Sequence, residues 1–374
     1  MTTINDFKGK LKMRVLLLSE ITSIHTKRWA DSLSKAGIQV CVFSLFNNES
    51  ARPSQYEVVS VNLPQISRQE RIDDGSFSKL RYLTAVSKLK QVIKSYKPDI
   101  IHAHYASSYG LLGALAFKHP YVVSVWGSDI LLFPKVSFIH RSVIKFVFRK
   151  ADYLFSTSRN MANEGNRYTN KPIKIIPFGI DCDLFRPRRK IHEVFTIGCT
   201  KNLLPIYGID KLIKAFAIVC NSIQAKLVLV GDGPEREHLM ALAQSLNVQD
   251  KVSFEGNHNH DEMMQYYNEF DVAVFLSDSE SFGVVALEAM ACECPLIVSH
   301  TLGFDEVVPN EAGFFVDRNN EQQIASKILY LHDNPQIGNE MGHQGRIFVQ
   351  KNYSWEENVS QMIKYYDDIL TNYN

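Results

Sequence analysis

One stretch of the chain brings together two carboxylates, a glycine and the start of an apolar helix. Residues 277–291 read Ser-Asp-Ser-Glu-Ser-Phe-Gly-Val-Val-Ala-Leu-Glu-Ala-Met-Ala, and an apolar strand pattern over 271–276 precedes them. Ser279 or Ser281 is expected to cap the helix, while Gly283 lets a ligand approach the first free backbone N–H groups. The stretch therefore predicts a phosphate-binding turn with an acid at each end.

The spacing of the two acids, Glu280 and Glu288, limits the chemistry. At ~1.5 Å per helical residue their backbones lie roughly 12 Å apart, whereas the carboxylates of a glycosidase flank one bond at about 5 to 9.5 Å. Two acids astride a helix N-terminus suit opposite ends of one extended ligand. We expect a nucleotide diphosphate sugar, with diphosphate on the N–H groups, sugar hydroxyls on Glu280 and ribose hydroxyls on Glu288. The alternative interpretation is a buried helix with two incidental acids.

Length and composition are those of a globular protein with two domains. The chain has 374 residues, of which 45% are hydrophobic and 22% are charged, and single cores stop growing beyond about 250–300 residues. No apolar run approaches the ~18 residues of a membrane span, and the first residues lack the apolar segment of a signal peptide. The six cysteines show no C-x-x-C spacing. We therefore expect core thiols and a cytoplasmic location.

Strand and helix patterns alternate along both halves of the chain. Buried strands are expected at 13–19 and 99–104 in the first half, and at 194–199 and 271–276 in the second. This alternation predicts an α/β protein with doubly wound parallel sheets. The expected arrangement is two Rossmann-like domains with a cleft between them.

Several further segments match, in order, one known family. They are Pro-Asp-Ile-Ile-His-Ala-His at 98–104, Trp-Gly-Ser-Asp at 126–129, Tyr-Gly-Ile-Asp at 207–210, Leu-Val-Leu-Val-Gly-Asp-Gly-Pro at 227–234, Val-Ser-Phe-Glu-Gly at 252–256, Pro-Leu-Ile-Val-Ser at 295–299 and Gly-Phe at 313–314. With Glu280 and Glu288 as an E-x7-E motif, the chain resembles the retaining glycosyltransferases of GT-B fold, family 4. The resemblance covers nearly the whole chain and is strongest from 196 to 317.

The resemblance implies a domain organisation and a reaction. It implies an acceptor-binding domain over 1–185, a donor-binding domain over 186–354, and a last helix over 355–374 that packs back on the first domain. The reaction is transfer of a sugar, with retention, from a nucleotide diphosphate sugar, for which UDP is the first expectation. The acceptor is a saccharide or a polyprenyl-diphosphate-linked saccharide, in surface polysaccharide or glycoconjugate biosynthesis. Neither nucleic acid nor a cofactor is expected.

The resemblance also assigns residues to the donor. Glu280 orients the sugar and Lys201 binds the diphosphate. The other expected donor-binding residues are Ser281, Phe282, Gly283, Val284, Val285, Glu288, Gly231 and Gly233. Relatives carry a second cation just before the glycine of the next helix, where this chain has Tyr207, so stabilisation of the leaving group stays open unless another Arg or Lys substitutes.

The first half departs from the family at a second position. Trp126 stands where many relatives have a histidine that contacts sugar, and an indole cannot transfer a proton. The role is therefore expected either to be lost or to move to His104 or His25. Asp129, three residues on, is expected either to bind the acceptor or sugar or to cap the following segment.

Two other motifs favour no cofactor. The run Gly-Asp-Gly-Pro-Glu-Arg at 231–236 follows a strand, but Arg236 stands where a dinucleotide fingerprint has its third glycine. Asp181 and Asp183 mimic a metal-binding D-x-D, yet they lie in a linker, 179–185, that is typical of GT-B relatives. We therefore expect no metal, and the diphosphate charge is expected to be met by N–H groups and cations.

Charge is unevenly distributed between the halves. Residues 1–190 carry 30 Lys and Arg against 14 Asp and Glu, whereas the remainder carries 11 against 26. A basic first half favours an anionic partner, either a lipid surface or a phosphate-bearing acceptor. Arg141, Lys145 and Arg149 recur at helical spacing beside apolar residues. They form either a solvated stripe or a surface for peripheral contact with an anionic membrane, at its inner face.

Two other functions remain open from the sequence. Nucleotide-sugar 2-epimerases share the GT-B architecture, and they act without an acceptor. The second alternative is a non-catalytic subunit that binds a nucleotide sugar, in which Trp126 and Tyr207 mark lost activity.

Overall fold

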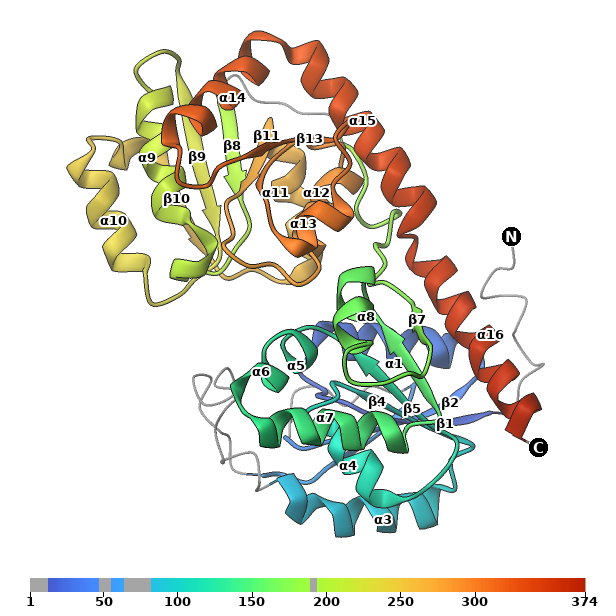
Figure 1. Cartoon of the computed structure of the whole chain (residues 1–374). Helices are drawn as coiled ribbons and strands as arrows, with labels where there is room; N and C mark the ends of the chain where they lie inside the picture. Colours follow the sequence, from blue (N-terminus) through green and yellow to red (C-terminus); the bar gives the residue numbers. More distant parts are fainter. Residues whose placement is uncertain (1–12, 47–54, 64–81, 189–193, 374) are drawn as a thin grey trace. The chain divides into compact units, whose positions relative to one another are not determined.

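The chain divides into two compact units (Figure 1). The first unit holds Met1–Phe178 together with Glu356–Asn374, and the second unit holds Gly179–Trp355. The computed structural model describes residues 13–46, 55–63, 82–188 and 194–373. Each unit is built around one parallel sheet.

In the described part of the first unit, seven parallel strands pair in the order β3-β2-β1-β4-β5-β6-β7. The strands are β1 (Arg14–Leu18), β2 (Gln39–Ser44), β3 (Glu57–Ser60), β4 (Ile100–His104), β5 (Tyr121–Val125), β6 (Tyr153–Ser156) and β7 (Ile173–Ile175). The helices are α1 (Ile24–Lys35), α3 (Ala85–Tyr96), α4 (Tyr109–Ala116), α5 (Ser128–Leu131), α6 (Phe133–Val136), α7 (Phe138–Lys150), α8 (Arg159–Gly165) and α16 (Trp355–Tyr373).

The central strands of this sheet are covered on both faces. Every residue of β4 and β5 is buried, as expected for parallel strands between two helical layers. Figure 1 shows α3, α4 and α7 along one face and α1 with α16 along the other. The near-continuous apolar runs that predicted these strands follow from this double cover.

The sheet of the second unit has, over residues 194–373, six parallel strands in the order β10-β9-β8-β11-β12-β13. The strands are β8 (Phe195–Cys199), β9 (Ala225–Val230), β10 (Val252–Gly256), β11 (Val272–Phe275), β12 (Leu296–Ser299) and β13 (Gly313–Val316). The helices are α9 (Ile209–Val219), α10 (Arg236–Ser245), α11 (Met263–Glu269), α12 (Val284–Ala291), α13 (Leu302–Val307), α14 (Glu321–Asp333) and α15 (Pro335–Asn352). A 3₁₀ turn, Pro205–Tyr207, precedes α9.

Each sheet has a point where its strand order reverses. Strand β1 lies between β2 and β4, and β8 lies between β9 and β11. In open parallel sheets, ligands bind beyond the carboxyl ends of the strands at such a point. The loops after β1 and β4, and those after β8 and β11, are therefore where a site is expected.

The C-terminal helix α16 packs on the sheet of the first unit. Tyr366 Oη lies 2.6 Å from His102 Nδ1, and His102 Nε2 lies 2.7 Å from Ser124 Oγ. Asn358 Nδ2 donates to the Pro177 carbonyl oxygen at 2.9 Å. His102 and Tyr366 are both fully buried, so their hydrogen bonds fix the helix to β4. No helix in the described ranges is both long and apolar enough to cross a bilayer.

Removing the Tyr366 hydroxyl is expected to destabilise the first unit. Tyr366→Phe leaves a buried ring nitrogen of His102 without its partner, which costs about 1–3 kcal/mol. Hydrogen exchange of the β4 and β5 amides measures this as a lower free energy of opening. Tyr373→Phe, at an exposed position of the same helix, is the control and should change nothing. Equal exchange in both variants would show that this contact does not hold α16.

Candidate active site

Lys201 and Glu280 form an ion pair at the strand-order reversal of the second sheet. Lys201 follows β8, and Glu280 follows β11. Their side chains are only 8% and 15% exposed. The Lys201 ammonium also lies 4.8 Å from the centre of the Tyr207 ring and 5.7 Å from that of Phe304. The structure thus brings together the two residues that the sequence predicts as catalytic, in a largely apolar setting.

Helix α12 begins beside this pair, but not where its sequence predicts. The expected caps, Ser279 and Ser281, are wrong, because Gly283 is the N-cap and has φ 93° with no side-chain cap hydrogen bond. A side chain there would need this left-handed conformation and would meet the Phe304 ring at 3.0 Å. The N–H groups of Val284 and Val285, in the first turn, have no partner within the helix. These free N–H groups make the N-terminus of α12, beside the ion pair, a favourable place for an anion.

The loop before α12 is held by close backbone contact with α13. Gly303 donates its N–H to the Glu280 carbonyl oxygen at 2.9 Å. A Cβ on Gly303 would lie 2.8 Å from that oxygen and from the Phe282 nitrogen. Glu280 is therefore positioned by the backbone as well as by Lys201.

Glu288 is buried within α12, and both of its carboxylate oxygens are engaged. Tyr267 Oη donates to Oε2 at 3.0 Å, and His260 Nε2 lies 2.7 Å from Oε1. Burial, followed by the nearby Glu288 charge, raises the pKa of Tyr267 well above its usual value, so the phenol stays protonated and donates. Sequence reasoning missed Tyr267 and His260, because only the folding of α11 against α12 brings them to Glu288.

Gly231 and Gly233 hold the loop that carries Lys201. A Cβ on Gly231, whose φ is 138°, would lie 2.3 Å from the Lys201 carbonyl oxygen. The same atom on Gly233 would lie 2.3 Å from the Leu203 carbonyl oxygen. Leu203 donates its N–H to the Asp232 carbonyl oxygen at 3.1 Å. These predicted donor-binding glycines therefore have a packing role, which places Lys201.

Arg318 is a further cation near the ion pair that sequence reasoning missed. It follows β13, and its Nη1 lies 2.6 Å from Asp278 Oδ1. Its Nη2 is 3.2 Å from the Cβ position built on Gly208, the residue after Tyr207. Asp278 donates its N–H to the Ile206 carbonyl oxygen at 2.7 Å, which ties the loops before α9 and α12 together. The only signal in the sequence for a role of Arg318 was its place just beyond the end of a strand.

An aromatic cluster lies at the carboxyl ends of the strands of the first sheet. His25 stacks on Phe178 with ring centres 4.1 Å apart, and His104 stacks on Trp126 at 4.2 Å. Trp126 also meets Phe178 edge-on at 5.2 Å. The structure thus brings His25, His104 and Trp126 together, as neighbours in one cluster.

The strand-end position of His104 predicts a side chain that is open to a ligand, but in the structure the side chain is not open. It is 2% exposed beneath Trp126, and its Nδ1 lies 3.1 Å from Ser19 Oγ. Burial lowers its pKa well below the usual value of 6.5, with the neighbouring His102 and His25 adding to the effect. His104 is therefore a neutral, hydrogen-bonded residue of the core at neutral pH.

Asp129 organises the backbone around Trp126. Its buried carboxylate accepts N–H hydrogen bonds from Ala106 at 2.7 Å, Gly127 at 2.8 Å and Trp126 at 3.1 Å. The predicted capping role is wrong, because Gly127 is the N-cap of α5 and no side chain caps that helix. The bond to Ala106, which joins the loops after β4 and β5, could not be predicted from the sequence.

Glu20 is a second carboxyl group that sequence reasoning left without a role. It follows β1, and its carboxylate accepts hydrogen bonds from Ser44 Oγ and Tyr109 Oη, both at 3.3 Å. Burial raises its pKa above the usual value of 4.5, although these bonds and those from Thr22 oppose the shift. It is an acid at the strand ends of the first unit.

Asp181, the first acid of the D-x-D run, makes local hydrogen bonds. Its Oδ1 accepts the N–H groups of Asp183 and Leu184, each at 3.0 Å, which closes a turn. Within the described ranges, no group of three His, Cys, Asp or Glu side chains is arranged to hold a metal ion.

Two family models match the chain in the order of its two units. Residues 14–158 match the model "Glycosyl transferase 4-like", and residues 183–348 match "Glycosyl transferases group 1". The chain belongs to the GT-B glycosyltransferases of family 4. The Lys201–Glu280 pair and α12 lie within the second match.

Similar proteins agree with this glycosyltransferase assignment. N-acetyl-alpha-D-glucosaminyl L-malate synthase of Bacillus anthracis is 27% identical over 77% of this chain and 79% of its own. The sucrose-phosphate synthase of Thermosynechococcus elongatus has a TM-score of 0.83, with 22% identity over 96% of this chain and 100% of its own. Anabaena Alr3699/HepE in complex with UDP and glucose has a TM-score of 0.76, with 20% identity over 95% and 99%. The two structures show the shared GT-B fold.

The buried histidines of this glycosyltransferase are expected to make its stability depend on pH. Burial lowers the pKa of His102 to about 3 and that of His104 well below 6.5. Below pH 6.5 the unfolded chain binds protons at both positions and the folded chain does not. The free energy of unfolding should therefore fall as pH drops from 7 to 5, with a slope that approaches about 1.4 kcal/mol per pH unit for each histidine toward pH 5.

Denaturant unfolding at pH 7, 6 and 5 checks this dependence. His102→Asn should reduce the slope by about 1.4 kcal/mol per pH unit, because one titrating group is removed. The slope, rather than the absolute stability, is the readout, since the variant also loses hydrogen bonds. An unchanged slope would contradict the assignment of His102 as a neutral core residue.

Proposed function

We propose that this glycosyltransferase moves a hexose-type sugar, with retention, from a nucleotide diphosphate sugar to a saccharide or lipid-linked saccharide. The observation that carries the proposal is the largely buried pair of Lys201 and Glu280 beside the N-terminus of α12. The arrangement offers an acid for sugar hydroxyls next to donors for a diphosphate. The UDP and glucose in the Anabaena HepE complex support UDP as the first carrier to test.

The diphosphate would lie at the start of α12. The N–H groups of Val284 and Val285 point along the helix axis, where the helix dipole favours an anion. Lys201 has three N–H donors, so it can bind a phosphate oxygen while it still contacts Glu280. Neither interaction needs a metal, and none is part of the proposal.

Arg318 would supply the second cation that Tyr207 cannot. It lies beside Gly208, at the start of α9, and its partner Asp278 is two residues from Glu280. Tyr207 instead places its ring under the Lys201 ammonium. Thus an arginine from the end of β13 would take the role of the cation that relatives carry at the position of Tyr207.

Glu280 and Glu288 would bind the two ends of the donor. Glu280 would accept hydroxyl hydrogen bonds from the sugar. A carboxylate has about four acceptor positions, so Glu288 can bind ribose hydroxyls while it keeps its bonds to Tyr267 and His260. Those two bonds fix the carboxylate before the donor arrives, which lowers the cost of binding.

The transfer breaks the bond between the anomeric carbon and the diphosphate oxygen. The acceptor hydroxyl would attack the face that the leaving group vacates and give its proton to a diphosphate oxygen. Negative charge then grows on the diphosphate, where Lys201, Arg318 and the α12 N–H groups stabilise it. Preorganised donors of this kind often supply the largest catalytic effect.

The aromatic cluster of the first unit would bind the acceptor. The half-buried Trp126 and His25 are the accessible members of the cluster, and flat rings suit the apolar faces of sugars. Asp129 would act indirectly, because its carboxylate holds the backbone of Trp126.

Glu280→Gln is expected to slow transfer strongly while donor binding remains. The amide keeps the shape of the side chain but loses the charge, and we expect kcat to fall about 10²–10³-fold, as for loss of one preorganised group. Calorimetry with UDP-sugars and a transfer assay with saccharide acceptors measure the two quantities. Glu311→Gln, at an exposed loop position, is the control.

The same assays separate the alternative functions. Epimerised nucleotide sugar without an acceptor would indicate an epimerase. Donor binding without any turnover in the native protein would indicate a binding subunit. Full transfer activity in Glu280→Gln would overturn the role of Glu280.

Arg318→Gln is expected to weaken binding of UDP about 10- to 100-fold, as for loss of a hydrogen bond to a charged group, worth about 1.5–3 kcal/mol. Affinity for uridine should not change, because it has no phosphate. Asp278→Asn should strengthen UDP binding, since it removes the anion that competes for Arg318. Lys214→Gln, a more exposed cation on α9, is the control. Equal losses for UDP and uridine would contradict a phosphate contact.

A further inference from the structure

The corner between α6 and α7 exposes four large apolar side chains. The exposed fractions are 57% for Leu132, 50% for Val136, 80% for Phe138 and 62% for Ile139. The corner itself is ordered by hydrogen bonds, because Ser137 caps α7 and its Oγ lies 2.6 Å from His140 Nδ1. An apolar group of this size at a fixed corner points to a surface that binds a partner.

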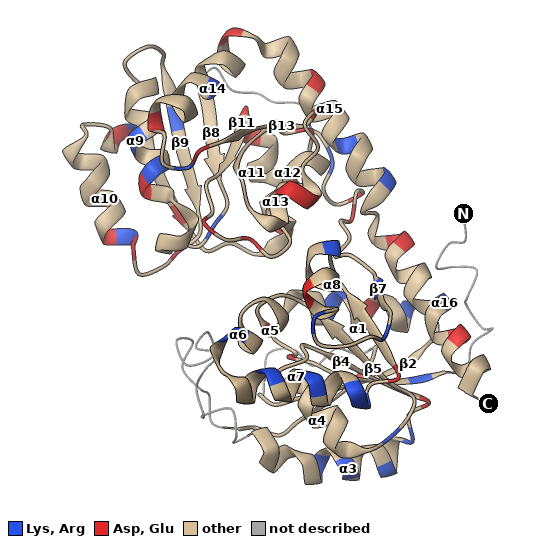
Figure 2. Ribbon diagram, in the orientation of Figure 1, with Lys and Arg blue, Asp and Glu red and all other residues tan. Residues whose placement is uncertain are grey.

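Helix α7 continues this corner with positive charge only. Its sequence, Phe138–Lys150, contains no acidic residue. Phe138, Ser142, Lys145 and Arg149 recur at intervals of four, three and four, so they share one face of the helix. Figure 2 shows the cations of α7 in a row along the helix. The apolar corner and the cations therefore form one continuous surface.

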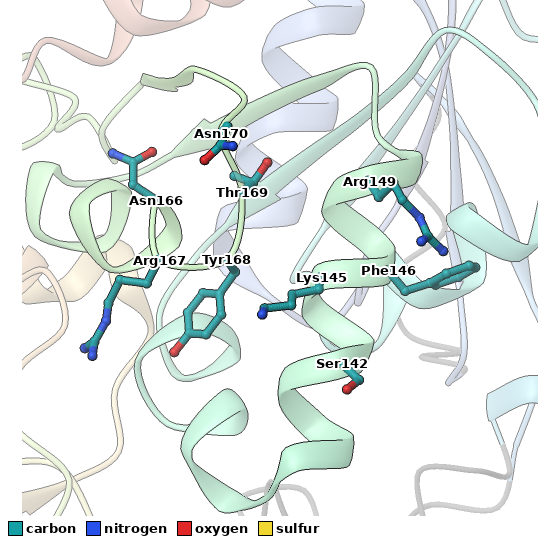
Figure 3. Close-up of a pocket in the computed structure, with 9 residues that line it drawn as sticks. All are labelled: Ser142, Lys145, Phe146, Arg149, Asn166, Arg167, Tyr168, Thr169 and Asn170. Atoms are coloured by element: carbon teal, nitrogen blue, oxygen red, sulfur yellow. The ribbon is translucent and has the colours of Figure 1, made fainter.

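A groove of about 630 Å³ lies along this row of cations. Its other wall is the segment that follows α8, which contributes Arg167, Tyr168 and Thr169. Figure 3 shows Lys145 reaching from α7 toward Tyr168 across the groove. Three cations, from Lys145, Arg149 and Arg167, therefore surround a space large enough for a phosphate-bearing head group.

No acidic side chain is among the described residues that line this groove, and Glu164, which contacts Arg167 and Tyr168 of its wall, is already neutralised. Glu164 Oε2 lies 3.2 Å from Arg167 Nη1, and Oε1 lies 3.7 Å from Lys135 Nζ. Tyr168 Oη donates to the same carboxylate at 3.0 Å. The other basic side chains, on α7, keep their charge available for an anion.

We propose that this surface docks the enzyme on an anionic lipid membrane. This protein surface, the α7 face, comprises Leu132, Val136, Phe138, Ile139, Lys145 and Arg149. The apolar side chains would enter the interface between head groups and acyl chains, and the cations would contact lipid phosphates. A soluble phosphate accounts for the groove alone, whereas a lipid surface accounts for the groove and the exposed apolar corner together.

Vesicle binding by the full chain tests the electrostatic part. Sedimentation with vesicles of phosphatidylcholine alone, or with 30 mol% phosphatidylglycerol added, gives the affinity. Each Lys or Arg near an anionic surface contributes about 1 kcal/mol, or about five-fold, so Lys145→Gln with Arg149→Gln should weaken binding about 25-fold. The control is Lys35→Gln with Lys351→Gln, on α1 and α15, which removes the same charge from other helices. The control should stay within about three-fold of the native protein.

Insertion of the apolar corner is tested separately. In Phe138→Trp, tryptophan emission should be quenched by lipids brominated on the acyl chain, whereas Tyr330→Trp, on α14, should be unaffected. Phe138→Ser with Ile139→Ser should weaken binding at least five-fold. Met240→Ser with Ile347→Ser, exposed apolar positions in the second unit, should not.

Three results would overturn the proposal. They are no preference of the native protein for anionic vesicles, equal losses in the α7 and control variants, and no quenching of the tryptophan at position 138. Displacement from vesicles by 10 mM inorganic phosphate at constant ionic strength would likewise overturn it, by showing that the groove binds a soluble anion.

Discussion

The ion pair between Lys201 and Glu280 is the constraint on which the second unit depends. Both charges are largely removed from water, and the loss of either partner would leave the other uncompensated, at a cost of about 3–5 kcal/mol for a buried pair. The backbone around the pair explains how they meet: Gly231 lets its loop press against Lys201, and Gly303 fixes Glu280. A donor therefore meets charges that are already positioned and already balanced.

The two units present different chemistry at equivalent edges of their sheets. In the second unit the strand ends hold charged groups and free helix N–H groups, which suit a diphosphate. In the first unit the corresponding edge holds an aromatic cluster, with His104 buried under Trp126, beside the carboxyl groups of Glu20 and Asp129. In the proposed function, anion binding and sugar stacking therefore belong to separate units. The excess positive charge of the first half of the chain lies elsewhere, in part on α7.

The sequence predicted most of what depends on neighbouring residues. Periodicity located the strands before the site within one or two residues. The family resemblance singled out Glu280 through the E-x7-E spacing and Lys201 through its place after a strand, and the structure brings the two side chains together. Prediction from the sequence failed where tertiary packing determines which residues meet. The cap of α12 moved to Gly283 because Phe304 and Gly303 crowd the loop. Arg318 follows β13, which is far along the chain from Lys201 and Glu280. The order of the strands in the sheet, which the sequence does not reveal, brings Arg318 close to them.

Amide hydrogen exchange across residues 280–287, with and without a UDP-sugar, tests the central claim most directly. If the diphosphate binds the start of α12, the N–H groups of Val284 and Val285 gain hydrogen-bond partners and exchange more slowly when the donor is present. Uridine, without phosphates, should leave these two amides unchanged. Slowed exchange elsewhere in the second unit, with residues 280–287 unaffected by a bound donor, would contradict the account.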